Sequence, residues 1–125
     1  MADIIFADDE ANNRLVMRMQ LELLHHHVRL AADGQQALEL VHQEPPDLLI
    51  LDLMMPVLNG VEACLALRAE PATARLPILL LTAMDRHELP ARATKAGFDA
   101  ILTKPFQMAE LAQVITTLAG RDGTP

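Results

Sequence analysis

Short runs of apolar residues alternate with longer amphipathic stretches along most of the 125-residue chain. The clearest run, residues 48–51, lies between Pro45-Pro46 and Pro56. An apolar run of this length with turn residues on both sides is typical of a strand buried on both faces, as in a parallel sheet. Four similar runs predict further strands, at residues 4–6, 28–30, 78–81 and 100–102. Because Arg29 interrupts the run at 28–30, we expect that strand nearer an edge.

The stretches between these runs carry helical patterns. Residues 10–24 have apolar side chains at every fourth position, which predicts a helix with one buried stripe. The members of that stripe are Ala11, Leu15, Met19 and Leu23. Asp33 and Gln36 have the spacing of a capping box at the start of the next helix. Further helices are predicted from Asn59-Gly60 to residue 69, over residues 87–96 and over residues 111–118.

The helix predicted at residues 87–96 contains Pro90, which a helix tolerates only in its first turn. With that helix included, five short strands alternate with five helices. This alternation predicts an α/β fold, a doubly wound five-stranded parallel sheet with helices on both faces. The length suits one domain, which we place at residues 1–119. The polar, turn-rich residues 120–125 are interpreted as a short tail or the start of a linker.

Composition removes several classes of function. The formal net charge is -7 and aromatic residues make up 2% of the chain, so basic patches and stacking platforms for nucleic acid are scarce. No apolar run approaches the roughly 20 residues that cross a bilayer, and the N-terminus does not resemble a signal peptide. One cysteine suits a reducing compartment. We therefore expect a cytoplasmic domain that binds neither nucleic acid nor membrane.

Specific polar residues follow four of the five predicted strands. They are Asp8 and Asp9, Asp52, Thr82, and Lys104. Taken singly, each could be an ordinary strand-end or surface residue, but open parallel sheets bind ligands at the carboxyl ends of their strands. Three clustered carboxylates stay ionised only around a cation, and Mg²⁺ prefers such oxygen ligands. A lysine and a hydroxyl can contact phosphoryl oxygens, and a carboxylate can accept a phosphoryl group. The set predicts phosphoryl transfer to an aspartate.

With these residues the chain resembles a response-regulator receiver domain of bacterial two-component signalling, of the chemotaxis-regulator type, over nearly its whole length. The resemblance is carried by Asp8-Asp9, by the segment DLMMPVLNG from Asp52 to Gly60, by Thr82-Ala83 and by Lys104-Pro105. It implies a flavodoxin-like three-layer sandwich with strand order 2-1-3-4-5. It also implies a phosphorylation-dependent switch that changes how a downstream effector protein or domain is bound.

The resemblance also implies a role for each site residue. Asp52 would accept the phosphoryl group from the phosphohistidine of a sensor histidine kinase or a phosphotransfer protein. Asp9, Asp52 and the backbone carbonyl of Met54 would bind Mg²⁺ directly, and Asp8 would act through a metal-bound water.

The phosphoryl oxygens would contact Thr82 and Lys104, together with the backbone N–H groups of Met54 and Ala83. A cis peptide is implied at Lys104-Pro105. One position departs from the family pattern, because Ile101 stands where an aromatic side chain is usual, three residues before the lysine.

Two other functions stay open at this point. One is a receiver-like interaction module that is never phosphorylated. The other is a phosphatase with an aspartyl nucleophile, which usually has an acid–base carboxylate two residues after the nucleophile. Met54 occupies that place, so the phosphatase is the weaker alternative. A receiver domain is not an enzyme in the ordinary sense, because it catalyses only its own phosphorylation and dephosphorylation.

Overall fold

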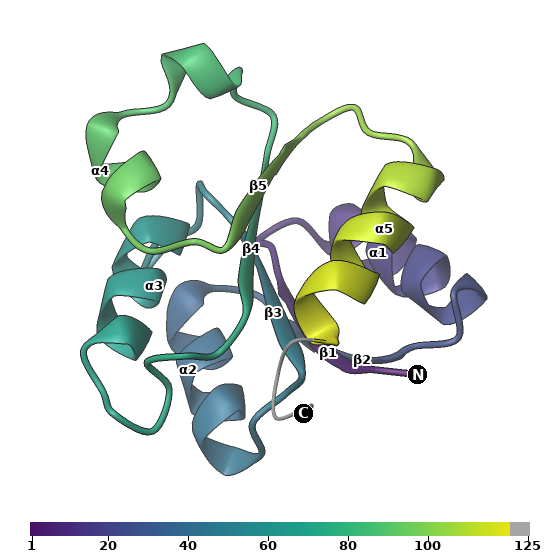
Figure 1. Ribbon diagram of the computed structural model, residues 1–125, viewed down its shortest axis with the longest axis horizontal. Coiled ribbons are helices and arrows are strands. Elements are labelled where there is room, and N and C mark those ends of the chain that lie inside the picture. The colour runs from purple at the N-terminus through teal and green to yellow at the C-terminus, as the bar shows by residue number, and fades with distance from the viewer. Residues whose placement is uncertain (121–125) are drawn as a thin grey trace.

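A parallel five-stranded sheet forms the centre of the protein (Figure 1). The computed structural model describes residues 1–120, without the side chain of Arg86, so the predicted tail lies outside the described residues except for Gly120. The strands are β1 (Asp3–Ala7), β2 (His27–Ala31), β3 (Leu48–Asp52), β4 (Ile78–Thr82) and β5 (Ala100–Thr103). Their order, β2-β1-β3-β4-β5, confirms the doubly wound fold and places β2 at an edge as predicted.

Helices cover both faces of the sheet and complete a three-layer sandwich. Within residues 1–120 they are α1 (Ala11–Leu23), α2 (Gly34–Gln43), α3 (Gly60–Arg68), α4 (Ala91–Lys95) and α5 (Met108–Ala119), with a short 3-10 turn, η1 (Arg86–Glu88). Helices α2, α3 and α4 lie on one face, and α1 and α5 lie on the other (Figure 1). None of the helices in this part of the chain has the length and hydrophobicity that a membrane span requires.

Side-chain caps set the start of two helices. The Asp33 carboxylate accepts a hydrogen bond from the backbone N–H of Gln36 at 2.8 Å, as the capping pattern predicts, whereas the Gln36 side chain accepts from Ala32. At the start of α3, the side chains of Asn59 and Glu62 accept hydrogen bonds from each other's backbone N–H groups, both at 2.9 Å. These bonds satisfy donors that the first helical turn leaves free.

The strands are apolar on both faces because each face packs against a separate layer of helices. Successive residues alternate between the two core clusters. One cluster, with α2, α3 and α4, takes Ile5, Ala7, Leu49, Leu51, Ile78 and Leu80. The other, with α1 and α5, takes Ile4, Phe6, Leu48, Ile50, Leu79 and Leu81. Strand pairing keeps like positions together, with Phe6 opposite Ile50 and Ile50 opposite Leu79.

The buried stripe predicted for α1 was wrong. Leu15, Met19 and Leu23 are 56%, 56% and 74% exposed, and α1 instead buries Met17 and Leu21 against the sheet. This helix carries apolar residues on two faces, so the spacing of one set did not decide which face turns inward.

Polar contacts account for the orientation of α1. Asn13 and Arg14 lie on the same side of the helix as Met17, three or four residues further on. Both reach Asp8 at the end of β1. These contacts turn this side of α1, and not the predicted stripe, toward the sheet.

The helix predicted at residues 87–96 is shorter than expected. Residues 86–88 form η1, and α4 begins only after Pro90, which takes the N-cap position with its carbonyl accepting from Ala93 at 2.9 Å. Proline has no N–H and its ring collides with the preceding turn, so a continuous helix through Pro90 is excluded.

The loop between β3 and α3 contains a residue in the left-handed region. Val57 has φ 67°, and the N–H of Leu58 donates to the carbonyl of Pro56 at 2.8 Å, which closes a tight γ-turn around Val57. The Val57 side chain is 73% exposed. The turn is held from outside, because Gly34 at the start of α2 donates to the Leu58 carbonyl at 3.1 Å and has no space for a Cβ there. A β-branched side chain is strained in this conformation.

We expect Val57→Gly to raise the free energy of unfolding by about 1 kcal/mol, because glycine adopts positive φ without the steric cost that valine has. Urea denaturation measures the change. Val57→Ala is the matched control, because alanine keeps a Cβ at positive φ and should gain less. A glycine variant no more stable than the wild type would contradict the assignment of strain.

Candidate functional site

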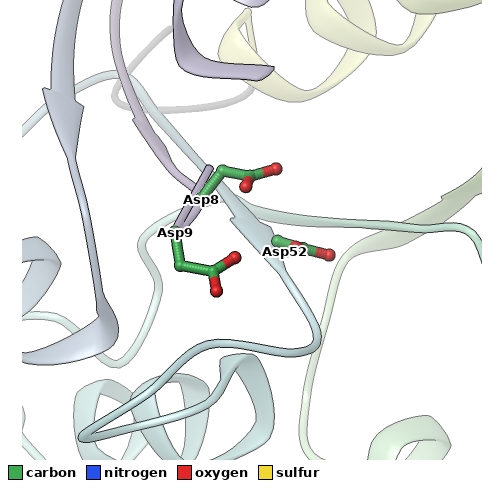
Figure 2. A group of neighbouring side chains, drawn as sticks. All are labelled: Asp8, Asp9 and Asp52. Atoms are coloured by element: carbon green, nitrogen blue, oxygen red, sulfur yellow. The ribbon is translucent and has the colours of Figure 1, made fainter. Parts of the chain in front are cut away.

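Three carboxylates meet at the carboxyl edge of the sheet (Figure 2). Asp8 and Asp9 directly follow β1, and Asp52 is the last residue of β3. Because β1 and β3 are neighbours with Ala7 opposite Leu51, the next residue on each strand arrives at the same place. A carboxylate oxygen from each of the three lies within 4.8 Å of the others. Asp8 is fully buried, Asp52 is half-buried and Asp9 is exposed.

Lys104 and Thr82 reach the same edge from β5 and β4. The Nζ of Lys104 lies 3.8 Å from Oδ2 of Asp8. The backbone N–H of Lys104 donates to the Thr82 carbonyl at 2.8 Å, and the buried Thr82 hydroxyl accepts from the N–H of Met84 at 3.1 Å. The Lys104-Pro105 peptide is cis, as the resemblance implied. The polar residues predicted from four strand ends are therefore brought to one edge.

The remaining predicted site residues lie in the loops that continue these strands. Met54 follows β3 by two residues and is exposed, and Ala83 follows β4 directly and is exposed. Their predicted contributions are backbone groups, and those roles stay predictions. Ile101 on β5 is partly buried and packs against the cluster formed with α2, α3 and α4.

Two residues of the site were not predicted from the sequence. The amide nitrogen of Asn13 lies 3.3 and 3.5 Å from the two carboxylate oxygens of Asp8, and Arg14 donates to the Asp8 backbone carbonyl at 2.8 Å. Both belong to the first turn of α1. The sequence did offer one signal, because a helix that starts just after Asp8-Asp9 places the side chains of its first turn near those carboxylates.

Burial and the close approach of carboxylates both disfavour the ionised form of Asp52. Burial, the neighbouring Asp8 carboxylate and, to a smaller extent, Asp9 together raise the pKa of Asp52 from 3.8 to about 6. The Lys104 ammonium and the backbone N–H of Leu53 act in the opposite direction without cancelling the shift. The cluster thus holds more negative charge than its own lysine neutralises.

The donor set fits a hard divalent cation. It consists of carboxylate oxygens, without the histidine or cysteine ligands that favour zinc. Mg²⁺ binds through one or two carboxylates and keeps several waters, which suits a cluster with one buried and one exposed member. The excess negative charge described above is what such a cation would neutralise.

Comparison with known proteins identifies the family. The sequence model of the family described as response regulator receiver domain matches residues 4–116 of the chain. The chain belongs to this family. Receiver domains are phosphoacceptor switches of two-component signalling and not enzymes in the ordinary sense.

The curated relatives that this chain matches are longer proteins. It is 42% identical over 118 residues to the response regulator MprA of Mycobacterium leprae, an alignment that covers 94% of this chain and 51% of MprA. The chain thus spans about half the length of such relatives.

Solved receiver structures have the same fold. One is the receiver domain of the sensor histidine kinase PA1611 from Pseudomonas aeruginosa, which has a magnesium ion coordinated in its active site cleft. It is 32% identical to this chain, with a TM-score of 0.86, and the match covers 95% of this chain and 98% of that one. The chemotaxis response regulator CheY4 of Vibrio cholerae is 30% identical with a TM-score of 0.86, covering 94% and 98%.

In metal-free buffer, Asp52→Asn should raise the thermal unfolding midpoint at pH values above about 6. The folded-state pKa of Asp52 exceeds its unfolded value, so ionised Asp52 destabilises the folded protein. This cost develops between about pH 4 and pH 6 and is complete above that range, so the gain should vanish toward pH 4. Circular dichroism melts at a series of pH values with a chelator measure it.

The control for this experiment is Glu39→Gln, which removes an exposed carboxylate from α2 and should not show the same pH dependence. Added Mg²⁺ should reduce the advantage of Asp52→Asn, because a cation compensates the repulsion in the wild type. An advantage of equal size at all pH values would contradict the assigned pKa shift.

Proposed function

We propose that Asp52 accepts a phosphoryl group from the phosphohistidine of a sensor histidine kinase or a phosphotransfer protein, in a Mg²⁺-dependent reaction that changes the binding of a downstream effector. The observation that carries the proposal is the convergence of three carboxylates and Lys104 at one edge of the sheet. The proposed receiver domain spans residues 1–119, and the family match over residues 4–116 supports that boundary.

Asp52 is suited to be the nucleophile. It is half-buried at the strand end, and with a pKa of about 6 it is mostly ionised near neutral pH. A carboxylate oxygen forms a bond to phosphorus while the bond from phosphorus to the histidine nitrogen breaks, and the electron pair of that bond stays on the imidazole. The product is an acyl phosphate on Asp52.

The surrounding residues stabilise the transferred group. The Lys104 ammonium and the Thr82 hydroxyl would contact phosphoryl oxygens, with the backbone N–H groups of Met54 and Ala83 completing the set. Transfer would require the Thr82 hydroxyl, which accepts from Met84, to turn its proton toward the phosphoryl oxygen. A phosphoryl group that holds Thr82 this way favours one arrangement of the loop after β4, which is how a local contact changes partner binding.

The metal would be held by residues already placed at the edge. Asp9, Asp52 and the backbone carbonyl of Met54 are the proposed direct ligands, and Asp8 would act through a bound water. When present, Mg²⁺ neutralises the carboxylates and the phosphoryl oxygens together. The magnesium ion in the active site cleft of the PA1611 receiver domain supports this proposal.

Incubation with acetyl phosphate and Mg²⁺, followed by intact mass measurement, tests the proposed acceptor. The wild type should gain the mass of one phosphoryl group, and Asp52→Asn should gain none. Asp85→Asn, an exposed aspartate in the loop after β4, is the control and should still be modified. A folded wild type that stays unmodified would favour the interaction module that works without phosphate.

The protein that donates the phosphoryl group also needs a docking surface, and we propose the exposed apolar side of α1. Leu15, Val16, Met19 and Leu23 form this α1 strip. Val16 also lines a groove that contains Lys104 and Phe106, so the strip is continuous with the edge where Asp52 lies. An exposed apolar patch next to a site is typical of a protein interface.

Met19→Asp should slow transfer from a phosphohistidine-bearing phosphotransfer domain about tenfold or more, because it places a charge in the centre of an apolar contact. Phosphorylation by acetyl phosphate should be unchanged, since Met19 is exposed and outside the carboxylate cluster. Timed transfer assays with both donors measure the effect. Leu65→Asp, at an exposed leucine of α3 in the opposite layer, is the matched control. Equal rates for Met19→Asp and the wild type would rule out the α1 strip.

A further inference from the structure

Asp8 is the most enclosed carboxylate of the site and therefore the one that depends most on its neighbours. Its side chain is 0% exposed, and a buried ionised carboxylate requires hydrogen-bond donors. The N–H of Glu10 donates to Oδ1 at 2.9 Å. Beyond this backbone donor, two side chains approach the carboxylate, Asn13 from α1 and Lys104 from the end of β5.

Asn13 is the closer of these two side chains and the one that touches both oxygens. Its amide nitrogen lies 3.3 Å from Oδ2 and 3.5 Å from Oδ1, whereas the Lys104 Nζ is 3.8 Å from Oδ2. A donor that bridges both oxygens opposes rotation of the carboxylate about its Cβ–Cγ bond. Arg14 fixes the backbone of the same residue, so α1 holds Asp8 at two points.

The chemistry of an amide suits this place. Three carboxylates and the Lys104 ammonium give a formal charge of -2 when all are ionised (three negative, one positive). Arg14 contacts only the backbone carbonyl of Asp8, and a further cation placed on the carboxylate beside Lys104 would lower that charge and weaken the attraction for a divalent cation. The Asn13 amide donates without altering the charge and does not titrate.

We infer that Asn13 is a positioning residue, whose amide holds the Asp8 carboxylate in the orientation that Mg²⁺ binding needs. The inference rests on the proposed function, because it deepens the account of the same metal site. The Asn13 amide contacts the Asp8 carboxylate, so we assign its effect on the metal to Asp8. Partners that orient metal-binding groups commonly contribute about 10-fold to 100-fold in metal affinity.

Magnesium titration of the full chain, followed by amide chemical shifts in NMR, tests the inference. Asn13→Ala and Asn13→Leu should both bind Mg²⁺ about tenfold more weakly than the wild type. The leucine variant keeps the side-chain volume and separates the lost amide from a packing defect. Asn13→Gln, which retains the amide, should recover part of the affinity. Asn12→Ala is the control, because Asn12 is the exposed neighbour on the same helix and should bind Mg²⁺ as the wild type does.

Acetyl phosphate kinetics give a second readout. The Mg²⁺ concentration for half-maximal phosphorylation should rise about tenfold in Asn13→Ala, whereas the rate at saturating Mg²⁺ should stay near that of the wild type. Wild-type affinity in a folded Asn13→Leu variant would overturn the inference while leaving the proposed function intact. A wild type that binds no Mg²⁺ and takes up no phosphoryl group would instead overturn the proposed function.

Discussion

Holding three carboxylates together, one of them buried and one half-buried, is the constraint on which this structure depends. The raised pKa of Asp52 shows that its burial and the nearby Asp8 together outweigh the attraction of Lys104. The molecule keeps Asp8 and Asp52 close by fixing each one separately. Neighbouring parallel strands deliver Asp8 and Asp52, while α1 holds Asp8 by its side chain and its backbone. Behind Asp52, the N–H of Gly60 donates to the Leu53 carbonyl at 3.0 Å and ties the following loop to the strand end.

Much of the fold followed from local patterns that have one physical solution. A short apolar run between turn residues has few alternatives to a buried strand, and all five predicted strands are present within a residue or two of their expected bounds. The caps at Asp33 and Asn59 mark helix starts because they satisfy specific backbone donors. The strand ends then led to the site, since parallel strands place their carboxyl ends at one edge.

The predictions failed where long-range contacts decide between local possibilities. Helix α1 has two apolar faces, and either could turn inward. The contacts of Asn13 and Arg14 with Asp8 favour the face that is buried. Such contacts join two segments, so the pattern of neither segment alone predicts them. For the same reason Asn13 was not assigned to the site. The positive φ of Val57 likewise depends on Leu58 docking on Gly34, from a different part of the chain.

The two-sided burial of the strands has a consequence for folding. In a sheet with one wet face, sliding a strand by one residue exposes its apolar set, so the alternation itself forbids the slip. Here residues 48–51 would be apolar on either face, and a slipped β3 would lose little hydrophobic contact. Such a slip would instead move Asp52 into the sheet or separate Asp47 from Asp3. The Asp47 carboxylate accepts a hydrogen bond from the backbone N–H of Asp3 at 2.8 Å. The charged ends of the strand thus act as stops, and the acceptor aspartate helps to align the sheet that presents it.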